Sequence, residues 1–254
     1  MKIYGIIPAR YGSTRFPGKP LALILDKPMF YHVYENSREC LLLDGLYLAT
    51  DDERILETAK KYDVPVIMTK STHTSGSDRV LEAAELIGAE DEDIIINIQG
   101  DEPLVRKEMI IDLIQPFFDD SFVEVTTLSC PITYDEARDP NLVKVVFNSD
   151  FWALYFSRAP IPYQRDPQDL GFMYWGHIGL YGFKFSILKR FSALKKGKLE
   201  EIEKLEQLRL LEFGIPIKVS TTHYKTIGVD KPEDIPKVED ILSKQRLLEG
   251  KKDD

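Results

Sequence analysis

The sequence contains little cysteine and no long apolar segment, and both absences narrow the class of protein. Only two cysteines occur among 254 residues, Cys40 and Cys130, and they lie far apart without the spacing of metal ligands. We expect both to be reduced thiols in or near the core. No run approaches the ~20 apolar residues that span a bilayer, and the apolar run at the N-terminus is too short for a signal peptide. The sequence therefore predicts a cytoplasmic protein with no membrane insertion.

The chain lacks an excess of positive charge, because 42 acidic residues outnumber 33 lysines and arginines. The formal net charge is −9 at pH 7 and the isoelectric point is about 5.1. A protein that binds duplex nucleic acid normally carries a basic surface, so nucleic acid is disfavoured as a partner. An acidic protein binds a small polyanion only where its basic side chains are concentrated locally. Residues 6–21, IIPARYGSTRFPGKPL, hold such a concentration in Arg10, Arg15 and Lys19.

Two common phosphate-binding motifs are missing. A Walker A loop requires G-x-x-x-x-G-K-[ST], but five residues separate Gly12 from Gly18, and Pro20 stands where a hydroxyl residue should follow Lys19. No G-x-G-x-x-G follows the first apolar run either. A P-loop and a dinucleotide site are therefore both disfavoured. Because a dehydrogenase needs a dinucleotide site, that class of enzyme is disfavoured as well.

Apolar runs alternate with helical patterns over the first hundred residues. This alternation predicts an α/β fold whose central sheet is mostly parallel and partly mixed, with helices on both faces. The near-continuous apolar runs agree, because strands of a parallel sheet are buried on both sides. Residues 130–184 are β-rich and aromatic, which predicts an excursion from this pattern, and residues 200–214 are helical in pattern. The expected strands are 2–7, 45–50, 64–68 and 93–98, and the expected helices are 28–40, 52–62 and 77–88.

The loop after the first strand is the first candidate site. Ligands of open α/β sheets bind beyond the carboxyl ends of the strands. Gly12 and Gly18 let the backbone come close to a ligand, and exposed N–H groups can form an anion nest. With the three cations of this loop, they predict a polyphosphate cradle. The alternative is a solvated loop whose charges are incidental.

Two aspartates are candidate metal ligands. Asp101 falls just beyond the apolar strand in INIQGDEPL, and Asp230 lies in IGVDKPED before a helix that begins with proline. From the residues alone, Asp230 is better explained as a turn or N-cap residue than as a metal ligand. For Asp101 these two interpretations are equally supported. Glu102 is a further candidate, whereas Asp52 and Glu53 have the pattern of a helix start.

Eight segments in order resemble one family, the sugar-activating nucleotidyltransferases. The closest resemblance is to the cytidylyltransferases that activate 3-deoxy-manno-octulosonate (Kdo) to CMP-Kdo, and it extends along nearly the whole chain. The segments are PARYGSTRFPGKPL (8–21), HTSGSDRV (73–80), NIQGDEPL (97–104), DPNLVKVVF (139–147), FSRAPIP (156–162), HIGLYGF (177–183), LEQLRLLE (205–212) and IGVDKPEDI (227–235).

The resemblance implies a single domain over 1–254 with a Rossmann-like nucleotidyltransferase fold. It implies transfer of CMP from CTP to Kdo, with release of pyrophosphate, for lipopolysaccharide biosynthesis, and Mg²⁺ as the cofactor. We expect a homodimer with residues 130–184 at its interface, and aromatic residues of that region in the core or at that interface. The alternatives are a cytidylyltransferase for another acidic sugar, such as a sialic acid or an amino analogue of Kdo, and a non-catalytic nucleotide- or sugar-binding module.

The resemblance also implies roles for individual residues. The catalytic residues are Arg10, Lys19, Asp101 and Asp230, of which Asp101 and Asp230 bind the metal. CTP is bound by Pro8, Ala9, Arg10, Ser13, Arg15, Lys19, Ser75, Gly76, Arg79, Gln99 and Asp101. The sugar is bound by Gln99, Arg158, His177, Tyr181, Glu206 and Gln207. Without the resemblance, His177 is better explained as a packing residue, Glu206 and Gln207 as helix-surface residues, and His73 as an ordinary loop residue.

Overall fold

A computed structural model describes residues 1–12, 16–73, 75–166 and 172–249. The chain divides into two compact units, and each is described by itself. The N-terminal unit comprises residues 2–89, 97–107 and 226–254, and the central unit comprises residues 1, 90–96 and 108–225. Both described cysteines are buried free thiols, as expected. No helix in these described ranges is long and apolar enough to cross a membrane.

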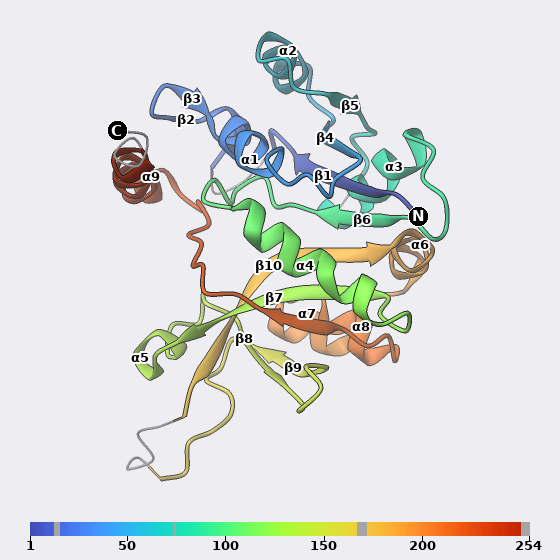
Figure 1. The fold of residues 1–254 in the computed structure, drawn as a ribbon, viewed down its shortest axis with the longest axis vertical. Helices are drawn as coiled ribbons and strands as arrows, with labels where there is room; N and C mark the ends of the chain where they lie inside the picture. Colours follow the sequence, from blue (N-terminus) through green and yellow to red (C-terminus); the bar gives the residue numbers. More distant parts are fainter. Residues whose placement is uncertain (13–15, 74, 167–171, 250–254) are drawn as a thin grey trace. The chain divides into compact units, whose positions relative to one another are not determined.

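Parallel strands form the centre of the N-terminal unit. Strand β1 (Ile3–Ala9) pairs in parallel with β4 (Gly45–Thr50), which pairs in parallel with β5 (Val66–Met68). Between the strands run α1 (Met29–Ser37), α2 (Glu53–Lys61) and α3 (Gly76–Leu86). Helices α1 and α3 contact β1, and α2 contacts β4 and β5 (Figure 1). The predicted alternation of strands and helices is confirmed. The strands are apolar on both sides, and the helices between them cover the sheet.

A small hairpin and the last helix complete the N-terminal unit. The elements are the short helix η1 (Lys19–Leu21), strands β2 (Leu23–Ile24) and β3 (Lys27–Pro28), the short helix η2 (Pro232–Asp234) and helix α9 (Ile235–Glu249). Their buried side chains form one cluster of Ile24, Met29, Leu104, Val229, Val238 and Leu242. This cluster brings the end of the chain beside the first loop, although about two hundred residues separate them in sequence.

The central unit is built around antiparallel pairing. Strand β7 (Val125–Ile132) pairs antiparallel with β10 (Tyr174–Lys184) and parallel with β11 (Lys218–Thr221). Strand β8 (Lys144–Phe147) pairs antiparallel with β10 and with β9 (Ala153–Ser157). The predicted β-rich excursion is therefore present. Strand β6 (Ile94–Asn97) leads out of this unit, because Asn97 already belongs to the N-terminal unit.

The central unit contains five helices in the described residues, and two of them correct the sequence prediction of one helical segment over 200–214. The five are α4 (Lys107–Asp119, from Glu108 onward), α5 (Tyr134–Ala137), α6 (Phe185–Ala193), α7 (Lys198–Glu203) and α8 (Leu208–Glu212). The helical pattern over 200–214 is not one helix, because Lys204 adopts a left-handed conformation with φ 56°. A buried ion pair joins the two halves, with Arg209 Nε 2.7 Å from Glu200 Oε2. The helical periodicity was correct on both sides of the break, but it could not reveal the break itself.

We predict that Gly182→Ala destabilises the protein. A Cβ at residue 182 of β10 would lie 2.5 Å from Thr126 Oγ1 and 2.8 Å from the ring of Phe117. Because overpacking of this kind typically costs about 1–3 kcal/mol, we expect the free energy of unfolding in urea to fall by that amount. Gly12→Ala is the matched control, since a Cβ there meets nothing within 4 Å. Equal unfolding free energies for the two variants would contradict this account of the packing.

Candidate functional site

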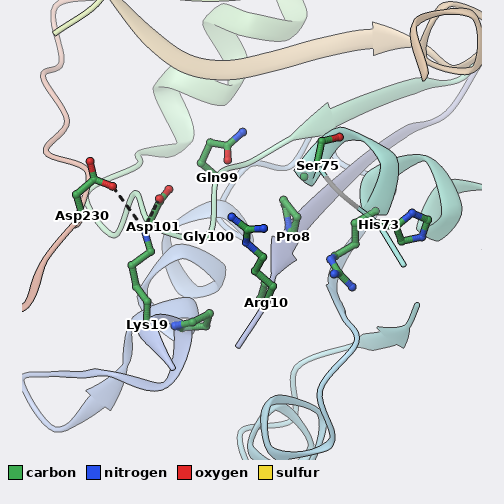
Figure 2. A pocket seen from close by; sticks show the side chains of 13 residues that line it. Pro8, Arg10, Lys19, His73, Ser75, Gln99, Gly100, Asp101 and Asp230 are labelled. Carbon is green, nitrogen blue, oxygen red and sulfur yellow. Dashed lines mark hydrogen bonds and ion pairs between the residues drawn. The ribbon is translucent and has the colours of Figure 1, made fainter. Parts of the chain in front are cut away.

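A pocket of about 230 Å³ opens in the N-terminal unit, where β1 and β6 end and α3 begins. Figure 2 shows Lys19, Asp101 and Asp230 at one end, His73 and Ser75 at the other, and Arg10 and Pro8 between them. Its position beyond the carboxyl ends of strands is the one expected of a ligand site in an open α/β sheet. The lining residues are Pro8, Ala9, Arg10, Lys19, Pro20, His73, Ser75, Gly76, Arg79, Gln99, Gly100, Asp101 and Asp230.

Lys19 brings the two predicted metal ligands together. Its Nζ donates a hydrogen bond to Asp101 Oδ2 at 2.6 Å and lies 3.9 Å from Asp230 Oδ1. The same ammonium donates to the main-chain carbonyl of Val229 at 2.9 Å. Two carboxylates from distant parts of the sequence therefore share one small region of the pocket, within reach of a single cation (Figure 2).

Main-chain contacts fix the position of Asp230. The N–H of Val229 donates to the carbonyl of Asp101 at 2.9 Å, and the N–H of Asp230 donates to Asp234 Oδ2 at 3.1 Å. Asp234 is thus the residue whose side chain caps this turn, while the carboxylate of Asp230 faces Lys19. The residues alone favoured a turn or N-cap residue at Asp230; it does lie in the turn before η2, but the N-cap position is Lys231, so the N-cap interpretation was wrong.

The opposite end of the pocket is built from the start of α3. Ser75 caps this helix, and its Oγ accepts a hydrogen bond from the N–H of Asp78 at 3.1 Å. Arg79 is buried, with its guanidinium 3.0 Å from Asp51 Oδ2 and donating to Thr69 Oγ1 at 2.5 Å. A guanidinium held by two partners loses little further freedom when a ligand binds. Arg79 is therefore fixed in place before any ligand arrives.

Gly100 permits a close approach that no other residue allows. A Cβ at this position would lie 2.7 Å from the carbonyl oxygen of Pro8. The loop that carries Gln99 and Asp101 can therefore lie directly against the end of β1 only because residue 100 has no side chain.

The acidic residues fit Mg²⁺ only together with phosphate oxygens. Among the residues that the structure describes, no three His, Cys, Asp or Glu side chains form a metal-binding group. Burial, with the nearby Asp101 charge, raises the pKa of Glu102 to about 8, so this third carboxyl is neutral at pH 7. Mg²⁺ usually takes one or two carboxylates and completes its shell with water and substrate phosphates. Asp101 and Asp230 match that preference.

The sequence prediction missed some lining residues. His73, interpreted as an ordinary loop residue, lines the pocket, and its Nε2 pairs with Glu82 Oε2. Pro20 and Gly100 also line it. The position of His73, two residues before the N-cap of α3, was the signal for its placement. The predicted residues Ser13 and Arg15 lie outside the described residues. The other nine residues assigned to CTP all line the pocket.

Predicted sugar ligands other than Gln99 lie in the central unit. His177 and Tyr181 are four apart on β10 and point to the same side, as expected for a strand. The hydroxyl of Tyr181 lies 3.1 Å from His177 Nε2, and Thr127 Oγ1 lies 2.9 Å from the same nitrogen. Burial lowers the pKa of His177 to about 3 and raises the pKa of Tyr181 well above its usual value. All three groups are therefore neutral polar groups at pH 7.

The guanidinium of Arg158 is engaged by the main chain. Its Nε donates to the carbonyl of Glu203 at 2.8 Å, and its Nη1 donates to the carbonyl of Pro140 at 3.0 Å. Buried Lys144 donates to the carbonyl of Arg158 itself. The structure thus gives Arg158 a tethering role in the central unit, and a role toward a substrate carboxylate stays a prediction.

Glu206 and Gln207 precede α8. Glu206 Oε1 lies 3.6 Å from Arg209 Nη2, and Gln207 is buried at the N-cap position of the helix. The expectation that these are ordinary helix-surface residues is therefore wrong for Gln207. In the aromatic region, Phe156 and Tyr174 are core residues, as expected.

Comparisons with known proteins agree with this architecture. A sequence model of the family described as cytidylyltransferase matches residues 4–227. A relative from Oleidesulfovibrio alaskensis, named 3-deoxy-manno-octulosonate cytidylyltransferase, is 53% identical over 232 residues, which cover 91% of this chain and 93% of the relative. A relative of the same name from Lawsonia intracellularis is 51% identical over 242 residues, which cover 95% and 94% of the two chains.

Solved structures extend the likeness to three dimensions. A CMP:2-keto-3-deoxy-manno-octonic acid synthetase complexed with CTP superposes with a TM-score of 0.91 at 40% identity, covering 96% of this chain and 100% of that chain. A 4-diphosphocytidyl-2C-methyl-D-erythritol synthase, 14% identical with a TM-score of 0.64 and coverage of 95% and 98%, shares the fold alone. The fold is therefore the mixed α/β fold of the nucleotidyltransferases, which confirms the predicted class.

The chain belongs to the cytidylyltransferase family. Within that family it groups with the 3-deoxy-manno-octulosonate cytidylyltransferases, since relatives of that name share about half of its residues over more than nine-tenths of its length. The family resemblance found in the sequence is confirmed.

We predict that His177→Gln makes stability less dependent on pH in acid. The folded protein keeps His177 neutral down to about pH 3, whereas the unfolded chain binds a proton below about 6.5. Unfolding then takes up a proton, so the parent loses stability as the pH falls below 6.5, by up to about 1.4 kcal/mol per pH unit. Glutamine keeps a neutral polar group without this titration.

Urea unfolding at pH 7, 6, 5 and 4.5 measures the difference in unfolding free energy between parent and variant. We expect that difference to shift in favour of the variant as the pH falls. His223→Gln is the control, because His223 is exposed. A parent–variant difference that stays constant with pH would contradict a neutral imidazole at His177 in the folded protein.

Proposed function

We propose that this protein transfers CMP from CTP to Kdo, giving CMP-Kdo and pyrophosphate. The observation that carries the proposal is the arrangement of Lys19, Asp101 and Asp230 at one end of a pocket whose other end is lined by the polar residues His73, Ser75 and Arg79. A triphosphate fits the first end, and a pyrimidine base fits the second. The names of the relatives and of the CTP-bound neighbour support the same reaction.

The transfer requires positioning and charge stabilisation more than covalent help from the protein. In the proposed reaction the anomeric hydroxyl of Kdo attacks the α-phosphorus of CTP, an O–P bond forms, and the bond to the departing pyrophosphate breaks, while the hydroxyl proton is released to solvent. Arg10 and Lys19 lie where they would hold the phosphates and offset the charge that develops on them. Ser75, Gly76 and the fixed guanidinium of Arg79 lie where they would hold the cytidine.

Magnesium dependence belongs to the proposal. Bound Mg²⁺ would neutralise phosphate charge and orient the leaving pyrophosphate. Asp101 and Asp230 would hold it, together with phosphate oxygens of the nucleotide. Their shared position around Lys19 supports this pairing, because both carboxylates already lie within 4 Å of one cationic group.

A sugar role for the central unit is also proposed. Gln99, Arg158, His177, Tyr181, Glu206 and Gln207 are the proposed Kdo ligands. The neutral His177–Tyr181 pair supports this, since both groups can exchange hydrogen bonds with sugar hydroxyls without carrying charge. We further propose a cytoplasmic homodimer with residues 130–184 at the interface, acting in lipopolysaccharide biosynthesis.

A panel of substrates tests the proposed function. Purified protein with MgCl₂ is given CTP, UTP, ATP or GTP, each with Kdo, a sialic acid or an amino analogue of Kdo, and pyrophosphate release is measured. We expect turnover with CTP and Kdo to exceed that of every other pair. Faster turnover with a different sugar acid would show that this acid, and not Kdo, is the substrate. CTP binding without turnover on any sugar would support a non-catalytic binding module.

We predict that Asp101→Asn retains the fold and lowers kcat by about a hundredfold or more, which is the usual scale for loss of a preorganised electrostatic contact. The measurement is pyrophosphate release at saturating CTP, Kdo and Mg²⁺, with circular dichroism to check the fold. The matched control is Asp119→Asn, an exposed aspartate of the central unit, which we expect to leave kcat unchanged. Near-parental turnover of Asp101→Asn would refute the metal role.

A further inference from the structure

Two successive aspartates, Asp51 and Asp52, follow β4, and each forms an ion pair with an arginine. Asp51 pairs with Arg79, which lines the pocket. Asp52 caps α2 and pairs with Arg54, which does not line it. The Asp52–Arg54 pair is bidentate, with Arg54 Nε 2.9 Å from Oδ1 and Nη2 2.7 Å from Oδ2. Such a fork fixes the plane of the guanidinium as well as its position.

The face of that guanidinium lies on Tyr11. Arg54 Cζ is 3.2 Å from the centre of the Tyr11 ring, so the cation is stacked on the aromatic face. Tyr11 also contacts Gly18, because a Cβ at Gly18 would lie 3.0 Å from the Tyr11 ring. The N–H of Gly18 donates to the carbonyl of Tyr11 at 2.9 Å. Arg54, Tyr11 and Gly18 therefore form a continuous set of contacts, called here the Tyr11 clamp.

The clamp joins the neighbours of two pocket cations. Arg10 directly precedes Tyr11, and Lys19 directly follows Gly18. Gly18 has a left-handed conformation, φ 71°, which turns the chain into η1 and carries Lys19 toward the two carboxylates. The Tyr11–Gly18 hydrogen bond thus joins the main chain next to Arg10 to the main chain next to Lys19, and Arg54 stacks on the side chain of Tyr11.

We propose that Arg54 is a positioning residue for the phosphate side of the pocket, acting through Tyr11 on Arg10 and Lys19. This inference rests on the proposed function, because it assumes that those two cations hold the phosphates of CTP. Arg54 acts by the geometry of its stack and not by attracting the nucleotide from a distance. Its charge is already balanced by the bidentate carboxylate of Asp52.

Nucleotide affinity tests the inference. Calorimetric titration gives the Kd of CTP and of CMP for the full-length parent and for Arg54→Ala. We expect Arg54→Ala to raise the Kd of CTP about fivefold to tenfold and that of CMP less than about twofold, because a misplaced pair of cations affects the triphosphate most. Equal increases for the two nucleotides would overturn the inference, as would no increase at all.

Two further variants separate geometry from charge. Arg54→Lys keeps the charge and loses the planar fork, so we expect it to resemble Arg54→Ala. Tyr11→Phe keeps the ring face, so we expect CTP affinity close to that of the parent. Lys61→Ala, which removes one exposed cation from the same helix, is the control for charge alone and should leave both Kd values unchanged. Parental CTP affinity in Arg54→Lys would overturn the stacking role.

Amide exchange of Gly18 gives a readout that does not depend on CTP. The Gly18 N–H is hydrogen-bonded to Tyr11, and we expect NMR-detected exchange at this amide to accelerate about tenfold or more in Arg54→Ala, with an unchanged thermal midpoint. If the parent does not bind CTP, the proposed function fails, and the exchange rate still decides whether Arg54 holds this turn. Unchanged exchange at Gly18 would overturn the inference.

Discussion

One ammonium group between two carboxylates is the constraint on which the pocket depends. Asp101 and Asp230 bring like charges into the same small region, which is unfavourable unless a cation offsets them. Lys19 supplies that cation, and its third partner, the carbonyl of Val229, ties it to the segment that carries Asp230. The contact joins positions separated by 82 and 210 residues, so the pocket can form only when the first loop, the loop after β6 and the segment before η2 have come together.

Two glycines allow the close approaches that this contact requires. Glycine occupies the position where the chain must turn left-handed before Lys19, and glycine again occupies the position where the Asp101 loop lies against Pro8. Behind them, Leu104 follows Asp101 and Val229 precedes Asp230, and both are buried in the same apolar cluster. The charged end of the pocket is therefore backed by hydrophobic packing, which fixes the backbone while leaving the carboxylates accessible.

The sequence predicted what depends on local pattern and missed what depends on packing between distant segments. Buried parallel strands leave long apolar runs, so β1, β4 and β6 were found close to their observed bounds. The hairpin of β2 and β3 has only two residues in each strand, too few for any periodicity. The break at Lys204 interrupts a good helical pattern, since a single left-handed residue leaves no mark on amphipathicity. Asp230 resembled an N-cap, and only the three-dimensional position of Asp234 shows which residue caps the turn.

The proposed chemistry explains why residues outside the pocket matter for the residues that line it. Phosphoryl transfer needs little covalent chemistry from a protein and depends mainly on the placement of charges. A misplacement of about an ångström can cost as much as the loss of a reacting group. Side chains that hold other side chains then matter nearly as much as those that touch a ligand. Asp51 contacts Arg79, and Arg54 contacts Tyr11; Asp51 lies just after β4, and Arg54 lies in the first turn of α2. The sequence predicted Asp52 at the start of a helix, which is correct. It did not predict that Arg54, two residues later, contacts Tyr11 of the first loop.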